Sequence, residues 1–245
     1  MPAFKDHFSR QAADYSRYRP AYPAELVAYV AALAPSRGLA VDCATGSGQA
    51  AVALALHFPQ VIAVDGSVRQ LAQARPARGV RYVAGLAERL PLRHGCAVLV
   101  AAAQAVHWFD FERFYAECRR VLVPKGLVAV WTYGMFRSDP ALDAIVDDFY
   151  SNVVGPWWPP ERRLVEDAYR SLPFPLREET APGFMLRTEW DLEQALGYFA
   201  SWSAVQRCRD ATGADPLPAL RRALEPHWTG PRRLEWQLHL RVGRV

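Results

Sequence analysis

The sequence predicts an α/β fold with a doubly wound, mostly parallel sheet, and two observations support it. First, apolar runs alternate with helical patterns through the first half of the chain, and these runs are rich in Val, Ala and Leu. Parallel strands that helices cover on both faces have this composition. Second, Gly46 and Gly48 separate the first apolar run, residues 39–43, from a helical pattern at 50–58. A buried strand that enters a helix through a glycine turn lets backbone N–H groups face a ligand, and this arrangement is typical of nucleotide-binding α/β proteins.

Local signals place the elements of this first half. A helical pattern starts after Pro23 and stops before Pro35, and Ser67 is a suitable N-cap for a helix after the second strand. The amphipathic pattern at 111–122 predicts a helix that Pro124 closes. The β-rich runs predict strands at 39–43, 61–64, 80–83, 97–102 and 127–131.

The second half departs from this alternation. Residues 139–180 hold a helical pattern at 142–150, the aromatic stretch GPWWPP and a further helix before SLPFP. An insertion after the fifth strand commonly contributes a lid or a pocket wall. Beyond the insertion, we expect strands at 184–190 and 234–242, a helix that Asp191 caps and that runs to Ser201, and a helix at 217–224.

Composition limits the class of protein. The chain has 245 residues, of which 51% are hydrophobic, and this is enough to bury a sizeable core in one domain. The formal net charge is +4, but the basic residues are spread along the chain without a run of five. This spread indicates a solvated basic surface and gives no support to nucleic acid as a partner.

The cysteines and the apolar runs indicate where in the cell the protein is expected. The four cysteines have no C-x-x-C spacing and are expected to be reduced, buried thiols, with neither a disulfide framework nor a metal site: Cys43, Cys96, Cys118 and Cys208. The N-terminal stretch MPAFKDHFSR lacks the apolar core of a signal peptide. The longest apolar run, residues 96–103, is far below the ~20 residues that cross a membrane. We therefore expect a cytoplasmic protein with no membrane segment.

Two further residues are candidates for chemistry. Asp65 ends the second β-rich run, about 20 residues after the glycine turn, where a dinucleotide fold places the acid that binds a ribose. His107 follows the fourth run, at the carboxyl edge of the sheet where open α/β folds bind ligands. Its ordinary pKa of about 6.5 suits a base, although a packed wall residue is an equally good interpretation.

These motifs resemble a known family. Asp42, Gly46, Gly48 and Asp65, followed by AGLAERLPL at 84–92 and AAAQAVHWFD at 101–110, resemble class I S-adenosylmethionine-dependent methyltransferases over residues 38–131. The motifs YSRYRPAYP, QAVHWFD and WDLEQALGYFASWSAVQR are similar to the small-molecule branch, methyltransferase type 11, that includes trans-aconitate methyltransferases.

The resemblance implies a Rossmann-like sheet of seven strands, with the last strand antiparallel and with a helical lid insertion. It implies a single domain over residues 1–245, divided into a cofactor-binding core at 38–131, a lid at 132–182 and strands and helices at 183–245 that complete the sheet. The oligomeric state does not follow from it.

The same resemblance implies the cofactor and the site. S-adenosyl-L-methionine would be converted to S-adenosyl-L-homocysteine, with no metal, on a small-molecule acceptor whose leading candidate is a carboxylate. Asp65 would hold the ribose, Ala87 and Glu88 the adenine, and Arg19 the carboxylate of the cofactor. His107 is the catalytic candidate, although an anionic acceptor needs no base. The full cofactor set is Arg19, Asp42, Ala44, Gly46, Gly48, Asp65, Gly66, Ala87, Glu88 and Gln104.

Three positions depart from the family pattern. Ala44 replaces the first glycine of the turn, which costs about 1–2 kcal/mol if that residue is left-handed. Leu86 stands where an acid commonly accepts the adenine amine, and such a charged hydrogen bond is worth ~1.5–3 kcal/mol. Ala97 replaces an acid that often opens the fourth strand.

Two other functions fit part of the pattern. Gly46, Gly48 and Ala51 satisfy G-x-G-x-x-A, so an NAD(P)-dependent oxidoreductase is one alternative. Against it, Asp42 interrupts the apolar strand and the chain has no Tyr-x-x-x-Lys pair. A non-catalytic nucleoside-binding protein is the other, since Ala44, Leu86 and Ala97 together weaken the cofactor pattern. A nucleic-acid acceptor is disfavoured, because AAQAVHW stands where base methyltransferases resemble one another in an Asn/Asp-Pro-Pro-aromatic segment.

Side chains outside the motifs give weaker signals. Arg137 follows the fifth strand and could meet an acidic acceptor, although a surface salt bridge is the preferred interpretation. Any single tryptophan is more often core than pocket wall in such a chain. The five considered for a pocket are Trp131, Trp157, Trp158, Trp190 and Trp202.

Overall fold

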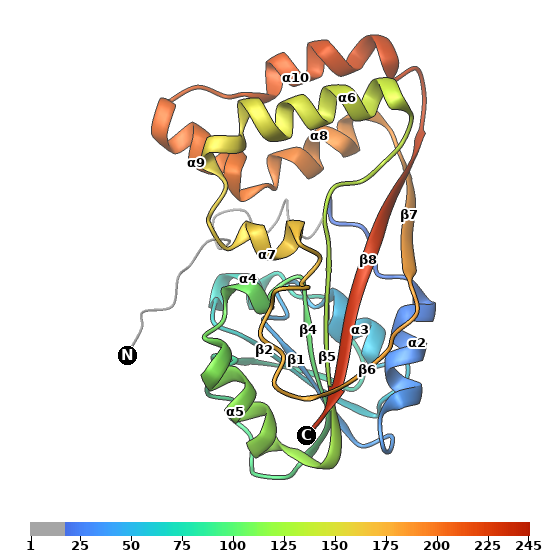
Figure 1. The fold of residues 1–245 in the computed structure, drawn as a ribbon, viewed down its shortest axis with the longest axis vertical. Coiled ribbons are helices and arrows are strands. Elements are labelled where there is room, and N and C mark those ends of the chain that lie inside the picture. Colours follow the sequence, from blue (N-terminus) through green and yellow to red (C-terminus); the bar gives the residue numbers. More distant parts are fainter. Residues whose placement is uncertain (1–17) are drawn as a thin grey trace.

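A computed structural model describes residues 18–245 of the chain (Figure 1). The predictions that concern residues 1–17, among them the absence of a signal peptide and the start of YSRYRPAYP, lie outside these residues. No helix in the described range is long and apolar enough to cross a membrane.

A mixed sheet organises the fold and confirms the predicted class. Its strands run in the order β3-β2-β1-β4-β5-β8-β6, with β7 paired to β8. Neighbours among the first five strands pair in parallel, whereas β8 is antiparallel to β5. The strands are β1 (Leu39–Cys43), β2 (Gln60–Asp65), β3 (Val80–Ala84), β4 (Ala97–Ala103), β5 (Leu122–Tyr133), β6 (Arg177–Glu179), β7 (Phe184–Trp190) and β8 (Arg232–Arg244).

The sheet has eight strands in the described chain, which corrects the expected seven. Strand β8 is 13 residues long and pairs with β7 along its first half and with β6 at its end. Two short strands therefore line the outer side of β8. The extra strand, β6, has the sequence REE, which carries no apolar alternation that could have predicted it.

The helices largely follow the predicted caps. The Ser67 side chain accepts from the Gln70 amide at the start of α4, and Asp191 forms a capping box with Gln194 at α8. Helix α9 was not predicted, since neither Gly nor Pro separates it from α8. The helices are α2 (Ala24–Leu33), α3 (Gln49–Leu54), α4 (Val68–Ala72), α5 (Phe111–Val121), α6 (Pro140–Asp148), α7 (Arg162–Glu166), α8 (Leu192–Ala200), α9 (Ser203–Thr212) and α10 (Leu217–Leu224).

A helical cap sits beyond one end of the sheet. Figure 1 shows α6, α8, α9 and α10 gathered there, with α7 between them and the sheet. The cap therefore draws helices from both the predicted lid at 132–182 and the segment at 183–245. Because β5, β7 and β8 extend toward the cap, the sheet carries it directly.

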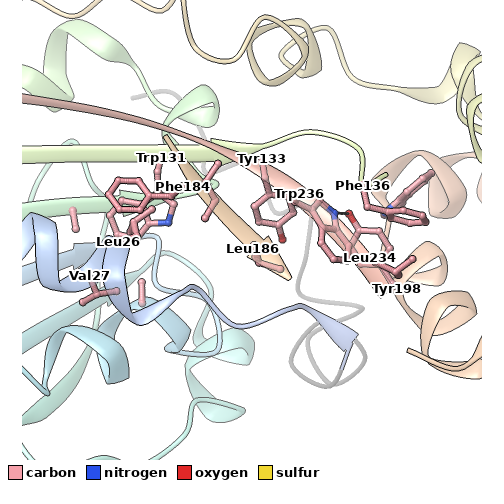
Figure 2. Packing of buried hydrophobic residues seen from close by; sticks show 14 of the residues in the cluster. Leu26, Val27, Trp131, Tyr133, Phe136, Phe184, Leu186, Tyr198, Leu234 and Trp236 are labelled. Carbon is pink, nitrogen blue, oxygen red and sulfur yellow. Dashed lines mark hydrogen bonds between the residues drawn. The ribbon is translucent and has the colours of Figure 1, made fainter. Parts of the chain in front are cut away.

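Aromatic side chains fill the junction between sheet and cap. Figure 2 shows Trp131 and Tyr133 of β5 and Trp236 of β8 in one continuous cluster that reaches Tyr198 of α8. The Trp236 indole N–H donates to the Tyr198 hydroxyl at 3.2 Å. A second buried cluster lies around Val41, Val100 and Phe114, so the parallel strands are covered on both faces.

Several smaller predictions are also tested. All four thiols are free; Cys43, Cys118 and Cys208 are buried as predicted, whereas Cys96 is only half-buried. Arg137 forms a surface salt bridge with Asp147 at 2.8 Å. This bond confirms the preferred interpretation of Arg137.

Candidate functional site

The turn between β1 and α3 has three residues in the left-handed backbone region. Their φ values are 52° at Ala44, 56° at Gly46 and 87° at Gly48. Ala44 therefore bears the strain of about 1–2 kcal/mol that an L-residue incurs in this region. A Cβ at Gly48 would lie 2.2 Å from the Tyr82 hydroxyl, whereas a Cβ at Gly46 would meet no atom closer than Gln70 Oε1 at 3.9 Å. A side chain at Gly48 would thus clash with Tyr82, whereas the space beside Gly46 is open.

The glycine amides are used within the protein, contrary to the expectation that they face a ligand. The Gly46 N–H donates to Asp65 Oδ2 at 2.8 Å. The Gly48 N–H donates to the Thr45 carbonyl at 2.9 Å. The turn itself satisfies the Gly48 amide and the acid at the end of β2 satisfies the Gly46 amide, so the contribution of these glycines lies in backbone shape and the missing side chain.

Asp42 lies beneath this turn at the end of β1. Its side chain is fully buried, and Oδ2 accepts from the Thr45 hydroxyl at 2.5 Å. Burial raises the Asp42 pKa to about 7, and the hydrogen bond from Thr45 opposes this rise. Oδ1 has no hydrogen-bond partner among the residues that the structure describes. Asp42 is therefore a carboxyl group poised to titrate near neutral pH.

Asp65 ties the second strand to the turn. It is 8% exposed at the end of β2, and Oδ1 accepts from the Ser67 N–H at 2.8 Å while Oδ2 accepts from Gly46. Each carboxylate oxygen can accept more than one bond. Gly66, which follows it, is half-buried. Asp65 thus fixes the two loops whose residues are predicted to bind the cofactor.

The predicted adenine residues follow β3. Ala87 is buried, and Glu88 is half-buried with its Oε1 accepting from the Asp110 N–H at 3.1 Å. Leu86 forms an isolated bridge with Arg89. Ala97 is fully buried at the start of β4, so an acid at this position would be desolvated in the core of this protein.

Gln104 joins the carboxyl ends of β4 and β5. Its φ of 54° is left-handed, and its Nε2 donates to the Tyr133 carbonyl at 2.9 Å. Its Oε1 accepts from the Thr132 hydroxyl at 2.7 Å and from the Tyr133 N–H at 2.9 Å. The side-chain amide is thus held by β5, and Gln104 acts on this edge as a rigid wall.

Arg19 spans the gap between the turn and the cap. Its Nη1 donates to the Tyr133 hydroxyl and its Nη2 to the Ser201 carbonyl, both at 3.4 Å. The guanidinium carbon lies 5.2 Å from the centre of the Tyr198 ring. Gln49 of α3 donates to the Arg19 carbonyl at 3.1 Å. Arg19 therefore contacts both the helical cap and the helix that follows the glycine turn.

A pocket lies where the sheet edge meets the cap. Its volume is about 40 Å³, room for about three water molecules. Of the predicted site residues, Arg19, Gln104 and His107 line it, which brings the first segment, β4 and the cap together. The full lining is Arg19, Gln104, His107, Trp108, Trp158, Pro159, Arg162, Tyr198, Trp202 and Ser203.

His107 is held as a neutral wall residue. Its Nδ1 lies 2.7 Å from the Tyr169 hydroxyl, and its side chain is buried. Burial lowers its pKa to about 3, and the positive charge of Arg162 lowers it further. Tyr169 has a left-handed φ of 60°, a backbone conformation that L-residues seldom adopt. The ordinary pKa that suggested a base does not apply here.

Sequence reasoning missed part of this pocket. Arg162 and Tyr169 lie in the lid, where no periodic pattern or spacing marks a role. Tyr198 lies near the end of the predicted helix that Asp191 caps, but no spacing in the sequence marks it as a wall of the pocket. Among the tryptophans, Trp158 and Trp202 line the pocket, whereas Trp131 and Trp190 are buried in the core.

Comparisons with known proteins agree on one class of enzyme. A family model described as a methyltransferase domain matches residues 41–130. A protein of Dictyostelium discoideum, provisionally named a methyltransferase, is 32% identical over 225 residues, which are 90% of this chain and 86% of that protein. A solved structure from Anaeromyxobacter dehalogenans, provisionally described as a type II methyltransferase, is 43% identical with a TM-score of 0.85, covering 93% of this chain and 98% of that chain.

A further relative matches only part of the chain. The malonyl-[acyl-carrier protein] O-methyltransferase of Methylococcus capsulatus is 34% identical over 116 residues, which are 44% of this chain and 42% of that protein. This chain is therefore similar to it over less than half of either length.

Proposed function

Because the chain belongs to the class I S-adenosylmethionine-dependent methyltransferases, we propose that it methylates a carboxylate oxygen of a small acceptor. The pocket at the sheet edge carries this proposal. Arg19 and Arg162 bring two guanidinium groups to it, and no Asp or Glu lines it within residues 18–245. A pocket with this charge favours an anion over a neutral or cationic acceptor. One relative is named as an O-methyltransferase, which is consistent with oxygen as the methylated atom.

The residues beside the pocket fit S-adenosylmethionine as the cofactor. Space above Gly46 is open, and Asp42 Oδ1 beneath the turn has no partner in the described chain. A cationic group above this turn would favour the ionised form of Asp42. The proposed division of the site gives the amino-acid moiety to Arg19, Asp42, Ala44, Gly46, Gly48 and Gln104, the ribose to Asp65 and Gly66, and the adenine to Ala87 and Glu88.

The chemistry places few demands on proton transfer. S-adenosylmethionine supplies, when bound, an electrophilic methyl group that an anionic oxygen can take directly. The oxygen lone pair forms the new C–O bond, the C–S bond breaks toward sulfur, and no proton moves. The role of this chain is to align the acceptor and exclude water, which the aromatic walls formed by Trp158, Tyr198 and Trp202 can do.

His107 then serves as a positioning residue. A group with a pKa of about 3 is neutral at physiological pH, but it is too weak a base to take a proton from most acceptors. Its bond to Tyr169 holds the lid against the sheet edge. The proposed reaction needs nothing more from it.

Of the two alternative functions, one is excluded and the other is tested below. Membership of the methyltransferase family overturns the NAD(P)-dependent oxidoreductase, and the G-x-G-x-x-A match of Gly46, Gly48 and Ala51 is incidental to the turn. A non-catalytic nucleoside-binding protein predicts cofactor binding without turnover, and the following experiment separates the two outcomes.

The proposed function is tested in two steps. Calorimetry should show binding of S-adenosylmethionine and S-adenosylhomocysteine and no binding of NADH. A screen that follows S-adenosylhomocysteine release should then give turnover with small carboxylic acids and none with their methyl esters. Failure to bind S-adenosylhomocysteine, or turnover confined to amines and thiols, would contradict the proposal.

We expect His107→Ala to lower turnover at saturating acceptor while S-adenosylhomocysteine affinity stays within about twofold, a shift below 0.5 kcal/mol. Tyr169→Phe removes the same hydrogen bond from its other end and should lower turnover in the same direction. The rate of the wild-type protein should show no ionisation near pH 6.5, because His107 remains neutral there. A rate that falls with such an ionisation, and loses it in His107→Ala, would restore the histidine as a base.

A further inference from the structure

Arg162 is held in one orientation by the lid. It is the first residue of α7, and its Nε donates to the Tyr150 hydroxyl at 2.8 Å. That hydroxyl in turn donates to Glu166, which leaves its oxygen turned to accept from the arginine. The guanidinium carbon lies 4.6 Å from the centre of the Trp158 ring and 5.4 Å from that of Tyr150. Stacking and the Nε bond together fix the plane of the guanidinium.

This arginine lines the pocket and forms no salt bridge with an acidic side chain of residues 18–245. Of the guanidinium nitrogens of Arg162, only Nε has a hydrogen-bond acceptor among residues 18–245, the Tyr150 hydroxyl. Nη1 and Nη2 have none in this range. Arg162 lines the pocket, and its charge reaches the buried His107 strongly enough to lower the pKa of that histidine. The two parallel N–H groups at the end of a fixed fork match the two oxygens of a carboxylate.

Arg19 is less suited to this task. Both of its terminal nitrogens donate to protein oxygens, and its carbonyl is bonded to Gln49 beside the glycine turn. It therefore lies toward the predicted cofactor side of the pocket, whereas Arg162 lies toward the lid. The two arginines meet different parts of the bound molecules.

We propose that Arg162 is the specificity-determining residue that holds an anionic group of the acceptor, and that this group is not the one methylated. The inference rests on the proposed function and extends it. Methylation of a carboxylate removes its charge, so an arginine paired with the reacting oxygen would stabilise the substrate more than the transition state. An arginine paired with a second anionic group stabilises both equally and thus contributes binding and alignment. The acceptor accordingly carries a carboxylate, or an equivalent anion, beyond the group that reacts.

The test uses benzoate as a flat anionic probe and benzamide as its neutral counterpart. Protein saturated with S-adenosylhomocysteine is titrated with each, for the wild type and for Arg162→Gln, Arg162→Lys and Arg163→Gln. Arg163 is the exposed neighbour on the same short helix, so its variant matches the charge change without touching the pocket lining. We expect Arg162→Gln to lose at least about tenfold in benzoate affinity, the effect of one charge-assisted hydrogen bond.

The neutral ligand and the remaining variants should give the following affinities. Benzamide should bind all four proteins with similar, weaker affinity, and Arg163→Gln should behave as the wild type. Arg162→Lys keeps the charge but lacks the fork, so its benzoate affinity should be intermediate. Tyr150→Phe keeps the stacked ring but removes the acceptor of Nε, and should lose a few-fold in benzoate affinity without a change for benzamide.

The outcomes separate the two proposals. Absence of S-adenosylhomocysteine binding by the wild type would sink the proposed function itself. If S-adenosylhomocysteine binds every variant equally, but the wild type shows no preference for benzoate or Arg162→Gln retains it, the methyltransferase proposal stands and the role of Arg162 is wrong. A variant that loses S-adenosylhomocysteine affinity together with benzoate affinity would also overturn the assignment, because the effect would then be structural.

Discussion

Asp65→Ala should weaken S-adenosylhomocysteine binding at least about tenfold and should destabilise the cofactor-free protein as well. The carboxylate accepts from the amides of Gly46 and Ser67, both at 2.8 Å, and it is 8% exposed. Hydrogen bonds to a charged group contribute ~1.5–3 kcal/mol each, and alanine leaves two amides without their acceptor. Cofactor affinity is to be measured by calorimetry and the free energy of unfolding by urea titration.

A matched control separates a loss of cofactor affinity from a loss of folding stability. Asp139 caps α6 and also accepts from two backbone amides, those of Ala141 and Leu142, each at 3.1 Å. Asp139→Ala should therefore destabilise the protein while leaving cofactor affinity unchanged. Equal losses of cofactor affinity in both variants would mean that binding reports only overall stability.

The ribose contact itself needs a thermodynamic cycle. In the wild type, the 2′-deoxy analogue of S-adenosylhomocysteine should bind about tenfold more weakly than the parent compound, since it lacks a hydroxyl that Asp65 would accept from. In Asp65→Ala the two compounds should bind equally, because the partner of that hydroxyl is gone. The same ratio in both proteins would leave Asp65 as a brace for the turn alone.

The second large effect concerns the pH dependence of stability. The Asp42 pKa is raised from 3.8 to about 7 in the folded protein, so between these values the folded state binds more protons than the unfolded state. Stability is therefore lost as pH rises through this window, by an amount on the order of 4 kcal/mol when complete. Asp42→Asn removes the ionisation and should make the cofactor-free protein more stable than the wild type at pH 8.

His107 acts in the opposite direction. Its pKa is lowered from 6.5 to about 3, so the unfolded state binds more protons in that window and stability is lost as pH falls through it. The two effects overlap between pH 3.8 and 6.5 and largely cancel there. Asp42→Asn should unmask the histidine, so that its stability rises with pH over this interval while that of the wild type stays nearly flat.

Urea unfolding of the cofactor-free proteins at pH 5, 6.5 and 8 distinguishes these slopes. The exposed residue Asp148 provides the control, and Asp148→Asn should follow the wild type at each pH. If Asp42→Asn gives the same pH profile as the wild type, Asp42 is already ionised in the folded protein and its burial does not govern its titration. A profile of Asp42→Asn that falls with rising pH would contradict the contribution of His107.

The parts of the site that are local in sequence could be predicted without coordinates. Ser67 and Asp191 were identified as caps because a capping side chain bonds to amides within three residues of itself. The turn at Gly46 and Gly48 was likewise visible, because no other residue adopts its backbone as easily. The prediction that the glycine amides face a ligand was wrong, because the acceptor of the Gly46 amide is Asp65, 19 residues away.

What the sequence alone determined was therefore the order of most strands and helices, with β6 and α9 as exceptions, the strained turn at the end of β1 and the acid at the end of β2. Periodicity and backbone preference act over a few residues and are written in the chain. What tertiary structure decided was the chemistry of the pocket: the neutral His107 against Tyr169, 62 residues away, and Arg162 stacked on Trp158 with no salt bridge to an acid of the described chain. Solvent exclusion and charge act through space, so the pKa of a side chain and the counter-charge of an arginine are fixed only when distant segments meet.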